Sequence, residues 1–372
     1  MANLLQAPVQ KDNAVLFRNV VFVFGLVLGL LCVTLPFLRY LFFTVPFLVI
    51  LALLADGKVR FGEEIWPFLA FIIAGFILSP LGNNEGIKDL FFIFAGVSIS
   101  LLYKIPKVNL WTIFIIFLIG ALVFFGMSGA LTSGFSFDLA SSESSFESPF
   151  GFVFGLLIPF ALIEKRYRLL ILSCVMAFLC LKRIALLGAA VACVFILLGE
   201  KRGRYLLNPW VMIPVNLIFV AVLLFYGAGE FDFLIHEYTN QSANQLGMGR
   251  QEVLALPAKE IFAHPEQFFF WGQGPGTSYE LSKSGFSSLT KVNLHSDLVK
   301  IFYEYGLIFL SFMIALMYTA KSYTVRIGFV FLNTMFISDN TLIYYFLLFI
   351  FIYCVRTINT ADSKLTLEGV KS

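Results

Sequence analysis

Long runs of apolar residues restrict the possible folds of this chain more than any other feature of its sequence. A bilayer hydrocarbon core of about 30 Å requires roughly 20 apolar residues per helix, or fewer where neighbouring helices bury its ends. Lipid offers no partners to backbone amides and carbonyls, so only helices or closed barrels cross it. Barrel strands alternate polar and apolar side chains, whereas the runs here are continuous. The sequence therefore predicts an all-α polytopic membrane protein.

We expect twelve membrane spans in one integral membrane domain, residues 1–372. The predicted spans cover residues 15–35, 39–55, 65–82, 87–103, 108–128, 149–164, 168–181, 184–199, 208–227, 298–320, 325–338 and 341–356. The composition agrees, because 59% of the residues are hydrophobic and only 13% are charged, which lies outside the usual range for soluble domains. The first run has no cleavage-like site after it, and we expect it to be a retained helix.

The positions of the basic residues predict the orientation. With the N-terminus in the cytoplasm, five short inner loops hold Lys58, Arg60, Lys104, Lys107, Lys165, Arg166, Arg168, Lys201, Arg202, Arg204, Lys321 and Arg326. The short outer loops hold only Arg39, Lys88, Lys182 and Arg183. The positive-inside rule therefore predicts that both termini, including a tail at 357–372, are cytoplasmic and that the long polar loop 228–297 lies outside. The net charge of only +3 gives no indication of nucleic-acid binding.

All three histidines, His236, His264 and His295, lie in the loop 228–297. They are too far apart in sequence to resemble a metal-binding motif, and we expect no metal or other cofactor. His295 stands directly before the tenth span, which makes it the candidate catalytic histidine. We expect His236 and His264 to be incidental.

Lys182 and Arg183 violate the positive-inside rule. They lie in a connection so short that the two flanking helices must form a tight hairpin, with Arg183 opening the second helix. Arg183 could extend to lipid headgroups. Small residues on this helix instead predict a close-packing face within the bundle, where a guanidinium would need an anionic partner. These small residues are Ala185, Gly188, Ala189 and Ala192.

Two further motifs lie in or beside the long loop. Arg250 precedes a segment with apolar residues at helical spacing, which His264-Pro265 ends. The turn Gly272-Gln273-Gly274-Pro275-Gly276 has glycines, Gly274 and Gly276 among them, that permit backbone N–H groups to converge on an anion. In the tenth span, Lys300 and Glu304 are spaced i,i+4 and are expected to neutralise each other.

Arg183, Arg250 and His295 together suit a lipid-anchored pyrophosphate at the membrane surface. Arginine stays charged and holds phosphate oxygens with two hydrogen bonds at once. Histidine, with an ordinary pKa of about 6.5, can accept a proton from a sugar hydroxyl near neutral pH.

The chain resembles the O-antigen polymerase and O-antigen ligase superfamily. The resemblance is carried by Lys182-Arg183-Ile184-Ala185, by Arg250 with the glycine turn, and by His295-Ser296 with Gly306-Leu307 after nine further residues. It implies a metal-independent glycosyltransferase of the bacterial inner membrane that takes glycans from undecaprenyl pyrophosphate on the periplasmic side. Arg183 and Arg250, with Gly274 and Gly276, would bind the pyrophosphate and His295 would activate the acceptor hydroxyl. Accessory residues would be Lys182, Ser296 and Glu304.

The superfamily contains polymerases, which use a second lipid-linked repeat unit as acceptor, and ligases, which use lipid A core. The ligase pattern has a second glycine three residues after Gly306, where this chain has Phe309, so we favour a polymerase. The partners implied are the undecaprenyl-pyrophosphate-linked oligosaccharide, as donor and acceptor, membrane lipids, and a chain-length-regulating co-polymerase.

Two other classes of function remain open. Metal-dependent lipid-linked-sugar transferases carry an acidic pair on their first external loop, and Glu230-Phe231-Asp232 has that spacing but follows the ninth span. A flippase or another transporter of lipid-linked oligosaccharides also often has twelve helices. Such proteins commonly show charged residues deep inside spans and internal repeats, and neither is clear in this sequence.

Overall fold

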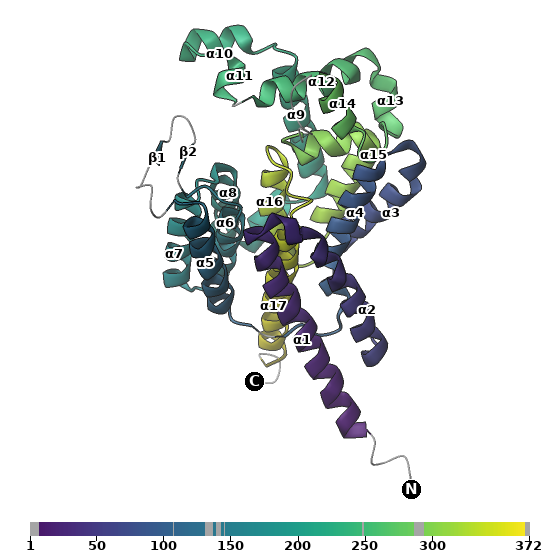
Figure 1. Cartoon of the computed structure of the whole chain (residues 1–372), viewed down its shortest axis with the longest axis vertical. Coiled ribbons are helices and arrows are strands. Elements are labelled where there is room, and N and C mark those ends of the chain that lie inside the picture. The colour runs from purple at the N-terminus through teal and green to yellow at the C-terminus, as the bar shows by residue number, and fades with distance from the viewer. Residues whose placement is uncertain are drawn as a thin grey trace.

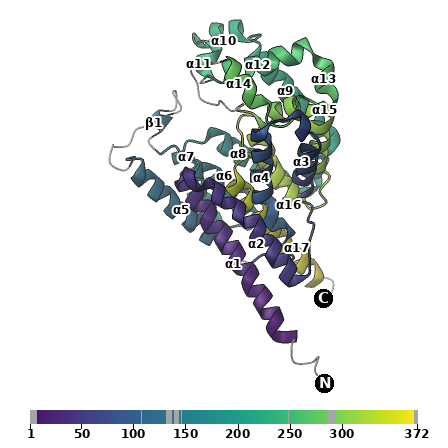
Figure 2. The same ribbon diagram turned by 45° about the vertical axis from the view of Figure 1, so that its right-hand side comes forward.

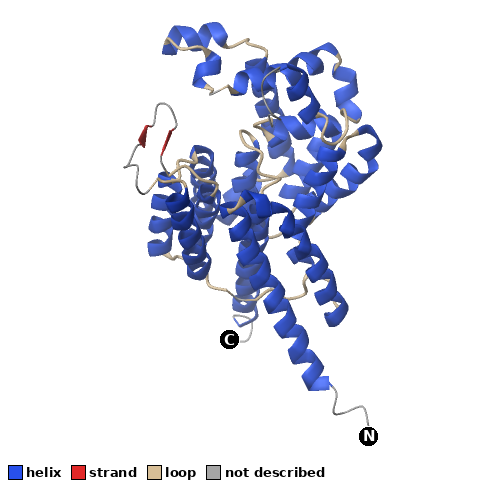
Figure 3. Ribbon diagram, viewed as in Figure 1, coloured by secondary structure: helices blue, strands red, loops and turns tan. Residues whose placement is uncertain are grey.

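The computed structural model describes residues 7–106, 108–130, 137–138, 143–144, 146–247, 249–285 and 294–368. Within them nearly all regular structure is helical (Figure 3), apart from a short antiparallel hairpin of β1 (Phe137–Asp138) and β2 (Glu143–Ser144). Lys107 and the last four residues of the predicted tail lie outside the described residues.

Each of the twelve predicted spans coincides with a helix, and the predicted fold class is confirmed. These helices are α1 (Ala7–Thr34), α2 (Thr44–Asp56), α3 (Trp66–Ile77), α4 (Asn84–Val97), α5 (Leu110–Met127), α6 (Phe150–Ile163), α7 (Tyr167–Leu179), α8 (Arg183–Leu206), α9 (Pro209–Gly227), α15 (Asp297–Tyr318), α16 (Tyr323–Phe336) and α17 (Tyr345–Glu368). Three 3-10 helices connect some of them, namely η1 (Pro36–Phe43), η2 (Ser79–Leu81) and η3 (Ser98–Leu101). The long polar loop forms α10 (Asp232–Thr239), α11 (Ala243–Leu246), α12 (Arg250–Ala263), α13 (Pro265–Phe270) and α14 (Ser278–Gly285).

The helices differ in length and in how far their neighbours bury them. Six segments of the described chain are long and apolar enough to cross a membrane alone, at Val15–Thr34, Phe37–Asp56, Leu110–Met127, Arg183–Leu206, Pro209–Gly227 and Asp297–Tyr318. The shorter α6 and α16 and the apolar part of α17 are buried on nearly every side, as expected for helices that are apolar all round. Aromatic pairs such as Phe22–Tyr353 and Phe329–Phe351, with ring centroids 4.9 and 5.2 Å apart, fill the space around α17. Burial by neighbours therefore explains why these helices are short.

The polar helices gather at one end of the molecule. Figures 1 and 2 show α10–α14 opposite the start of α1 and the end of α17. The assignment of the α10–α14 end to the periplasm stays a prediction.

Three helices have features that the predicted spans do not include. Helix α8 continues to Leu206, although its backbone leaves the helical conformation at Gly199 (φ 77°, ψ 162°), where the predicted span ends. Helix α15 is interrupted at Gly306 (φ 84°, ψ 170°), where an added Cβ would lie 2.8 Å from the carbonyl oxygen of Phe270. Helix α17 runs on to Glu368, so residues 357–368 of the predicted tail continue this helix.

Candidate functional site

The turn between α7 and α8 holds Lys182 and Arg183 in a fixed position. As predicted, Arg183 opens the second helix of a tight hairpin, and α7 ends at Leu179, before the predicted end at residue 181. The tight turn places Leu181 in the left-handed region at φ 46°, a strain of roughly 1 kcal/mol or more, and the buried Leu181 side chain keeps it there. Helix α6 approaches closely at Gly151, where a Cβ would lie 2.8 Å from the Lys182 Cγ.

One face of α8 packs as the small residues predicted, but the helix lies at the edge of the bundle. The small residues Ala185, Gly188, Ala189 and Ala192 are all buried. An added Cβ at Gly188 would lie 3.1 Å from the backbone oxygen of Phe331 in α16. The opposite face exposes apolar side chains such as Leu187 and Val194, so the prediction that α8 sits inside the bundle was wrong. Arg183 is exposed at the start of this helix.

A cavity of about 370 Å³ brings residues from distant parts of the chain together beside this turn. Its charged walls are Lys182, Arg183, Arg250, Glu147 and Asp339. Lys182 pairs with Glu147 at 2.6 Å. The cavity therefore combines three cations with two carboxylates, which leaves an excess of positive charge suited to an anionic ligand.

Arg250 reaches this cavity from the first position of α12. The preceding Gly249 has φ 80°, so the chain enters the helix through a turn that favours glycine. The predicted apolar positions Leu254, Ala258 and Ile261 of α12 are buried. An added Cβ at Gly227 of α9 would lie 2.7 Å from the Leu254 backbone. Close packing against a long helix thus positions Arg250.

His295 lies directly before α15 and beside the cavity rather than in its wall. Its side chain is exposed, yet the surrounding chain removes part of its water. This desolvation, followed by the positive charge of Arg250 and, more weakly, of Lys182, lowers the pKa of His295 below its ordinary value, while Asp339 opposes the shift. The neutral imidazole is the form that can accept a proton.

Asp339 and Glu147 are cavity residues that the sequence did not single out. Asp339 lies in the connection between α16 and α17, and its backbone oxygen accepts a 3.2 Å hydrogen bond from the amide of Asp297. The buried Asp297 carboxylate in turn accepts a 2.9 Å hydrogen bond from the amide of Leu342. These contacts attach the connection to the start of α15, next to His295.

The glycine turn does not reach the cavity. The Gly274 amide donates to the backbone oxygen of Glu304 at 2.9 Å. An added Cβ would lie 2.6 Å from the Leu81 backbone at Gly274 and 2.3 Å from the Gly86 amide nitrogen at Gly276. The structure therefore does not bring either glycine to the cavity, and their role in donor binding stays a prediction. The backbone of the turn packs instead against Leu81, Gly86 and Glu304.

Two of the three predicted accessory residues have structural roles. The buried Ser296 hydroxyl caps α15 by accepting a hydrogen bond from the Val299 amide at 3.3 Å. Glu304 is buried and accepts a hydrogen bond from the Ser278 hydroxyl. Lys300 forms its ion pair with Asp89 of α4 and not, as predicted, with Glu304. Of the accessory set, only Lys182 lines the cavity.

The other polar groups of the long loop lie outside the cavity wall. His236 is exposed on α10, and His264 is an exposed residue whose ring nitrogen lies 3.9 Å from Glu266. The Asp232 carboxylate of the acidic pair accepts a hydrogen bond from the side-chain amide of Gln251. Among the described residues, no group of three or more His, Cys, Asp or Glu side chains could hold a metal ion.

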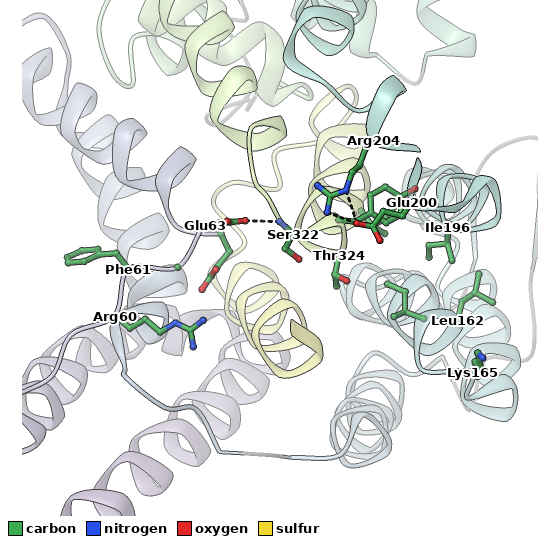
Figure 4. A pocket seen from close by; sticks show the side chains of 15 residues that line it. Arg60, Phe61, Glu63, Leu162, Lys165, Ile196, Glu200, Arg204, Ser322 and Thr324 are labelled. Atoms are coloured by element: carbon green, nitrogen blue, oxygen red, sulfur yellow. Dashed lines mark hydrogen bonds and ion pairs between the residues drawn. The ribbon is translucent and has the colours of Figure 1, made fainter. Parts of the chain in front are cut away.

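A larger cavity, of about 820 Å³, lies near the other end of α8 (Figure 4). Glu200 in its wall is roughly 25 Å along the helix from Arg183, at 1.5 Å per residue. Arg204 pairs with Glu200 at 2.6 Å, and the Ser322 amide donates to Glu63 at 2.9 Å. None of the predicted site residues lines this cavity.

Residues 169–314 match a family model described as O-antigen ligase. This segment is similar to that family. The match confirms the resemblance to the superfamily of O-antigen ligases and polymerases, which are enzymes of the glycosyltransferase type. The matched segment carries Arg183, Arg250 and His295, whereas Glu147 and Asp339 lie outside it. No curated protein and no solved structure matches the chain.

Replacing Gly276 by alanine tests whether the glycine turn serves packing alone. Gly276→Ala is expected to lower the stability of the detergent-solubilised protein by about 1–3 kcal/mol, because the new Cβ meets α4 at a positive φ. Gly57→Ala is the matched control, since Gly57 also has a positive φ (62°) but no atom within 4 Å of an added Cβ. Thermal unfolding should show a clearly larger loss for Gly276→Ala. A folded Gly276→Ala protein that no longer bound inorganic pyrophosphate would restore the original assignment.

Proposed function

We propose that the chain is an O-antigen polymerase that joins undecaprenyl-pyrophosphate-linked repeat units on the periplasmic face of the bacterial inner membrane. The observation that carries this proposal is the cavity in which Arg183 and Arg250, from distant segments, meet beside His295. The cavity lies at the end of the molecule that the positive-inside rule assigns to the periplasm.

The proposed reaction transfers a glycan between two lipid carriers. The bond between the donor's anomeric carbon and the pyrophosphate oxygen breaks, and its electron pair stays on the pyrophosphate. A hydroxyl oxygen of the acceptor forms the new bond to that carbon, and His295 accepts the hydroxyl proton. Arg183 and Arg250 stabilise the departing pyrophosphate more strongly than the bound donor, because its negative charge grows as the bond breaks.

Asp339 has a role in this scheme that follows from its position. Its carboxylate raises the pKa of His295, so it stabilises the imidazolium that forms when the acceptor proton is transferred. Lys182 adds positive charge to the pyrophosphate site once the anionic ligand competes with Glu147 for its ammonium group.

The polymerase proposal is preferred to a ligase because of Phe309. This residue replaces the second glycine of the ligase pattern, and its ring packs 5.1 Å from Tyr305 and 6.0 Å from Phe71 of α3. An aromatic side chain therefore fills space that a glycine would leave open to a neighbouring backbone. The ligase is the alternative, because the matching family model is described as O-antigen ligase, and a flippase is the second alternative.

The function is tested with the purified full-length chain, an undecaprenyl-pyrophosphate-linked repeat unit, and no nucleotide sugar. We expect a ladder of longer lipid-linked glycans on gel electrophoresis, unchanged by EDTA because the arginines supply the positive charge. Product formation only after lipid A core is added would identify a ligase. No new glycosidic bond with either acceptor would favour a transporter, and EDTA inhibition reversed by Mg²⁺ would indicate metal dependence.

The pH dependence of kcat/KM tests the environment of His295. Activity should fall at acid pH as the imidazole becomes protonated, with a midpoint below the ordinary pKa of about 6.5. Asp339→Asn removes a charge that raises the pKa of His295, so the acid limb should move to lower pH. Lys182→Gln removes a charge that lowers this pKa, so the acid limb should move to higher pH. Both shifts should be smaller than about one pH unit, because charges at partly exposed positions are screened. Shifts in the same direction would contradict the proposed arrangement.

A further inference from the structure

A second basic cavity, of about 580 Å³, has Val15, Arg18 and Asn19 of α1 in its wall. The start of α1 lies away from α10–α14 (Figure 1). The cavity walls come from α1, from the end of α2 with the residues that follow it, and from the segment 103–106. None of the candidate site residues lines it, and the proposed transfer reaction does not use it.

The cavity lies where two candidate membrane spans begin and end. Val15, in its wall, is the first residue of one candidate membrane span, and Asp56, also in its wall, is the last residue of the next. Two neighbouring spans thus begin and end at this level. The hydrocarbon core gives way there to the polar surface of the bilayer.

The cavity carries two positive charges that no carboxylate in the described chain is seen to balance. Among the described residues of its wall, Asp56 alone is acidic, and Arg18 pairs with it at 2.6 Å. The ammonium groups of Lys58 and Lys104 both lie over the ring of Tyr103, 5.3 and 5.8 Å from its centroid. Two like charges on one aromatic ring repel each other, and an anion between them would remove this repulsion.

Backbone pairing fixes the position of these lysines. Val59 and Leu102 form an antiparallel bridge, and the Arg60 amide donates to the Leu101 carbonyl at 3.1 Å. Lys58 and Tyr103 therefore lie next to paired residues. The larger cavity of Figure 4 differs, because its basic Arg60, Lys165 and Arg204 face the acidic Glu63, Glu64 and Glu200.

We propose that this cavity binds the phosphate of an anionic glycerophospholipid, with the phosphate oxygens between Lys58 and Lys104 and the acyl chains along α1 from Val15. Basic pockets between membrane helices bind such headgroups, and each lysine near the membrane surface contributes about 1 kcal/mol. A zwitterionic headgroup fits less well, because its ammonium group brings a further positive charge to a basic cavity.

Native mass spectrometry of the full-length chain in detergent tests the proposal. The chain is titrated with phosphatidylglycerol or with phosphatidylcholine of the same acyl chains. We expect phosphatidylglycerol to bind more tightly, and Lys58→Gln/Lys104→Gln to weaken its binding about 30-fold, as expected from the loss of two lysines. Lys58→Arg/Lys104→Arg should retain binding.

Lys201→Gln/Lys321→Gln is the matched control, because it removes the same charge from exposed positions outside the cavity. This control should change the affinity less than about twofold. Equal losses in both glutamine pairs would show diffuse attraction to a basic surface and overturn the proposal. Equal affinities for the two lipids, or equally tight binding of inorganic phosphate, would overturn it as well.

Discussion

Replacing Arg183, Arg250 or His295 by alanine is expected to abolish the ladder of lipid-linked glycans. Loss of one group that stabilises the developing charge lowers kcat by about 10²–10³-fold, and loss of a general base by about 10²–10⁴-fold. All three side chains are exposed or only half-buried, so their truncation leaves no unfilled core. The variants should therefore insert into the membrane and unfold at the wild-type temperature while losing activity.

Matched controls separate this loss from a general effect of charge removal. Arg202→Ala removes an exposed arginine near the other end of α8, and His236→Ala removes an exposed histidine from the same polar loop. Both should retain near wild-type ladders. Near wild-type activity in all three site variants would refute the site assignment, even if the unmodified chain makes the ladder of lipid-linked glycans.

The loss of activity should be larger in the arginine variants than in Lys182→Ala. Lys182 already pairs with Glu147, so part of its charge is balanced before any ligand binds. We expect a smaller loss for Lys182→Ala than for either arginine variant.

The helices could be predicted from sequence because hydrophobic runs report directly on local structure. The prediction that neighbours bury the shorter spans also agrees with α6 and α16. The depth of α8 in the bundle was not predictable in the same way. Its small residues correctly indicated a packing face, but nothing local reports whether a second neighbour covers the opposite face.

The site was only partly predictable, because chemistry alone linked its members. Arg183, Arg250 and His295 were grouped because they suit one ligand, and the structure places them around the same cavity. Asp339 lacked any such signal, since an aspartate in a short connection is common. Its place in the site becomes apparent only from the hydrogen bond that attaches its segment to the start of α15.

The glycine turn shows why a local pattern can mislead. Gly274 and Gly276 have positive φ angles of 98° and 82°. This conformation occurs both in anion-binding turns and where two backbone segments approach closely. Which of the two applies depends on what the turn contacts, and here it contacts the backbone at Leu81 and Gly86, almost 200 positions earlier in the chain. Similarly, the ion-pair partner of Lys300 lies 211 positions away, so an i,i+4 rule selected the wrong carboxylate.

The buried Lys300–Asp89 pair leads to the second large expected effect. Lys300→Met should destabilise the protein by about 3–5 kcal/mol, because it leaves the Asp89 carboxylate buried without its counter-ion. The side chains of the two residues are only 8% and 13% exposed, so water cannot replace the lost partner. Unfolding of the detergent-solubilised chain by heat or denaturant measures the effect.

The double variant Asp89→Leu/Lys300→Met distinguishes a buried ion pair from general damage to α15. Removing both charges should recover most of the lost stability, since replacing a buried pair by apolar residues is often neutral. Lys88→Met is the surface control: its pair with Glu85 is partly exposed and should contribute less than about 1 kcal/mol. If the double variant were as unstable as the sum of the two single variants, the pairing would not be the source of the stability. Because Lys300 lies one turn after Asp297, which holds the Asp339 connection, Lys300→Met should also lower activity, and the double variant should restore activity and stability together.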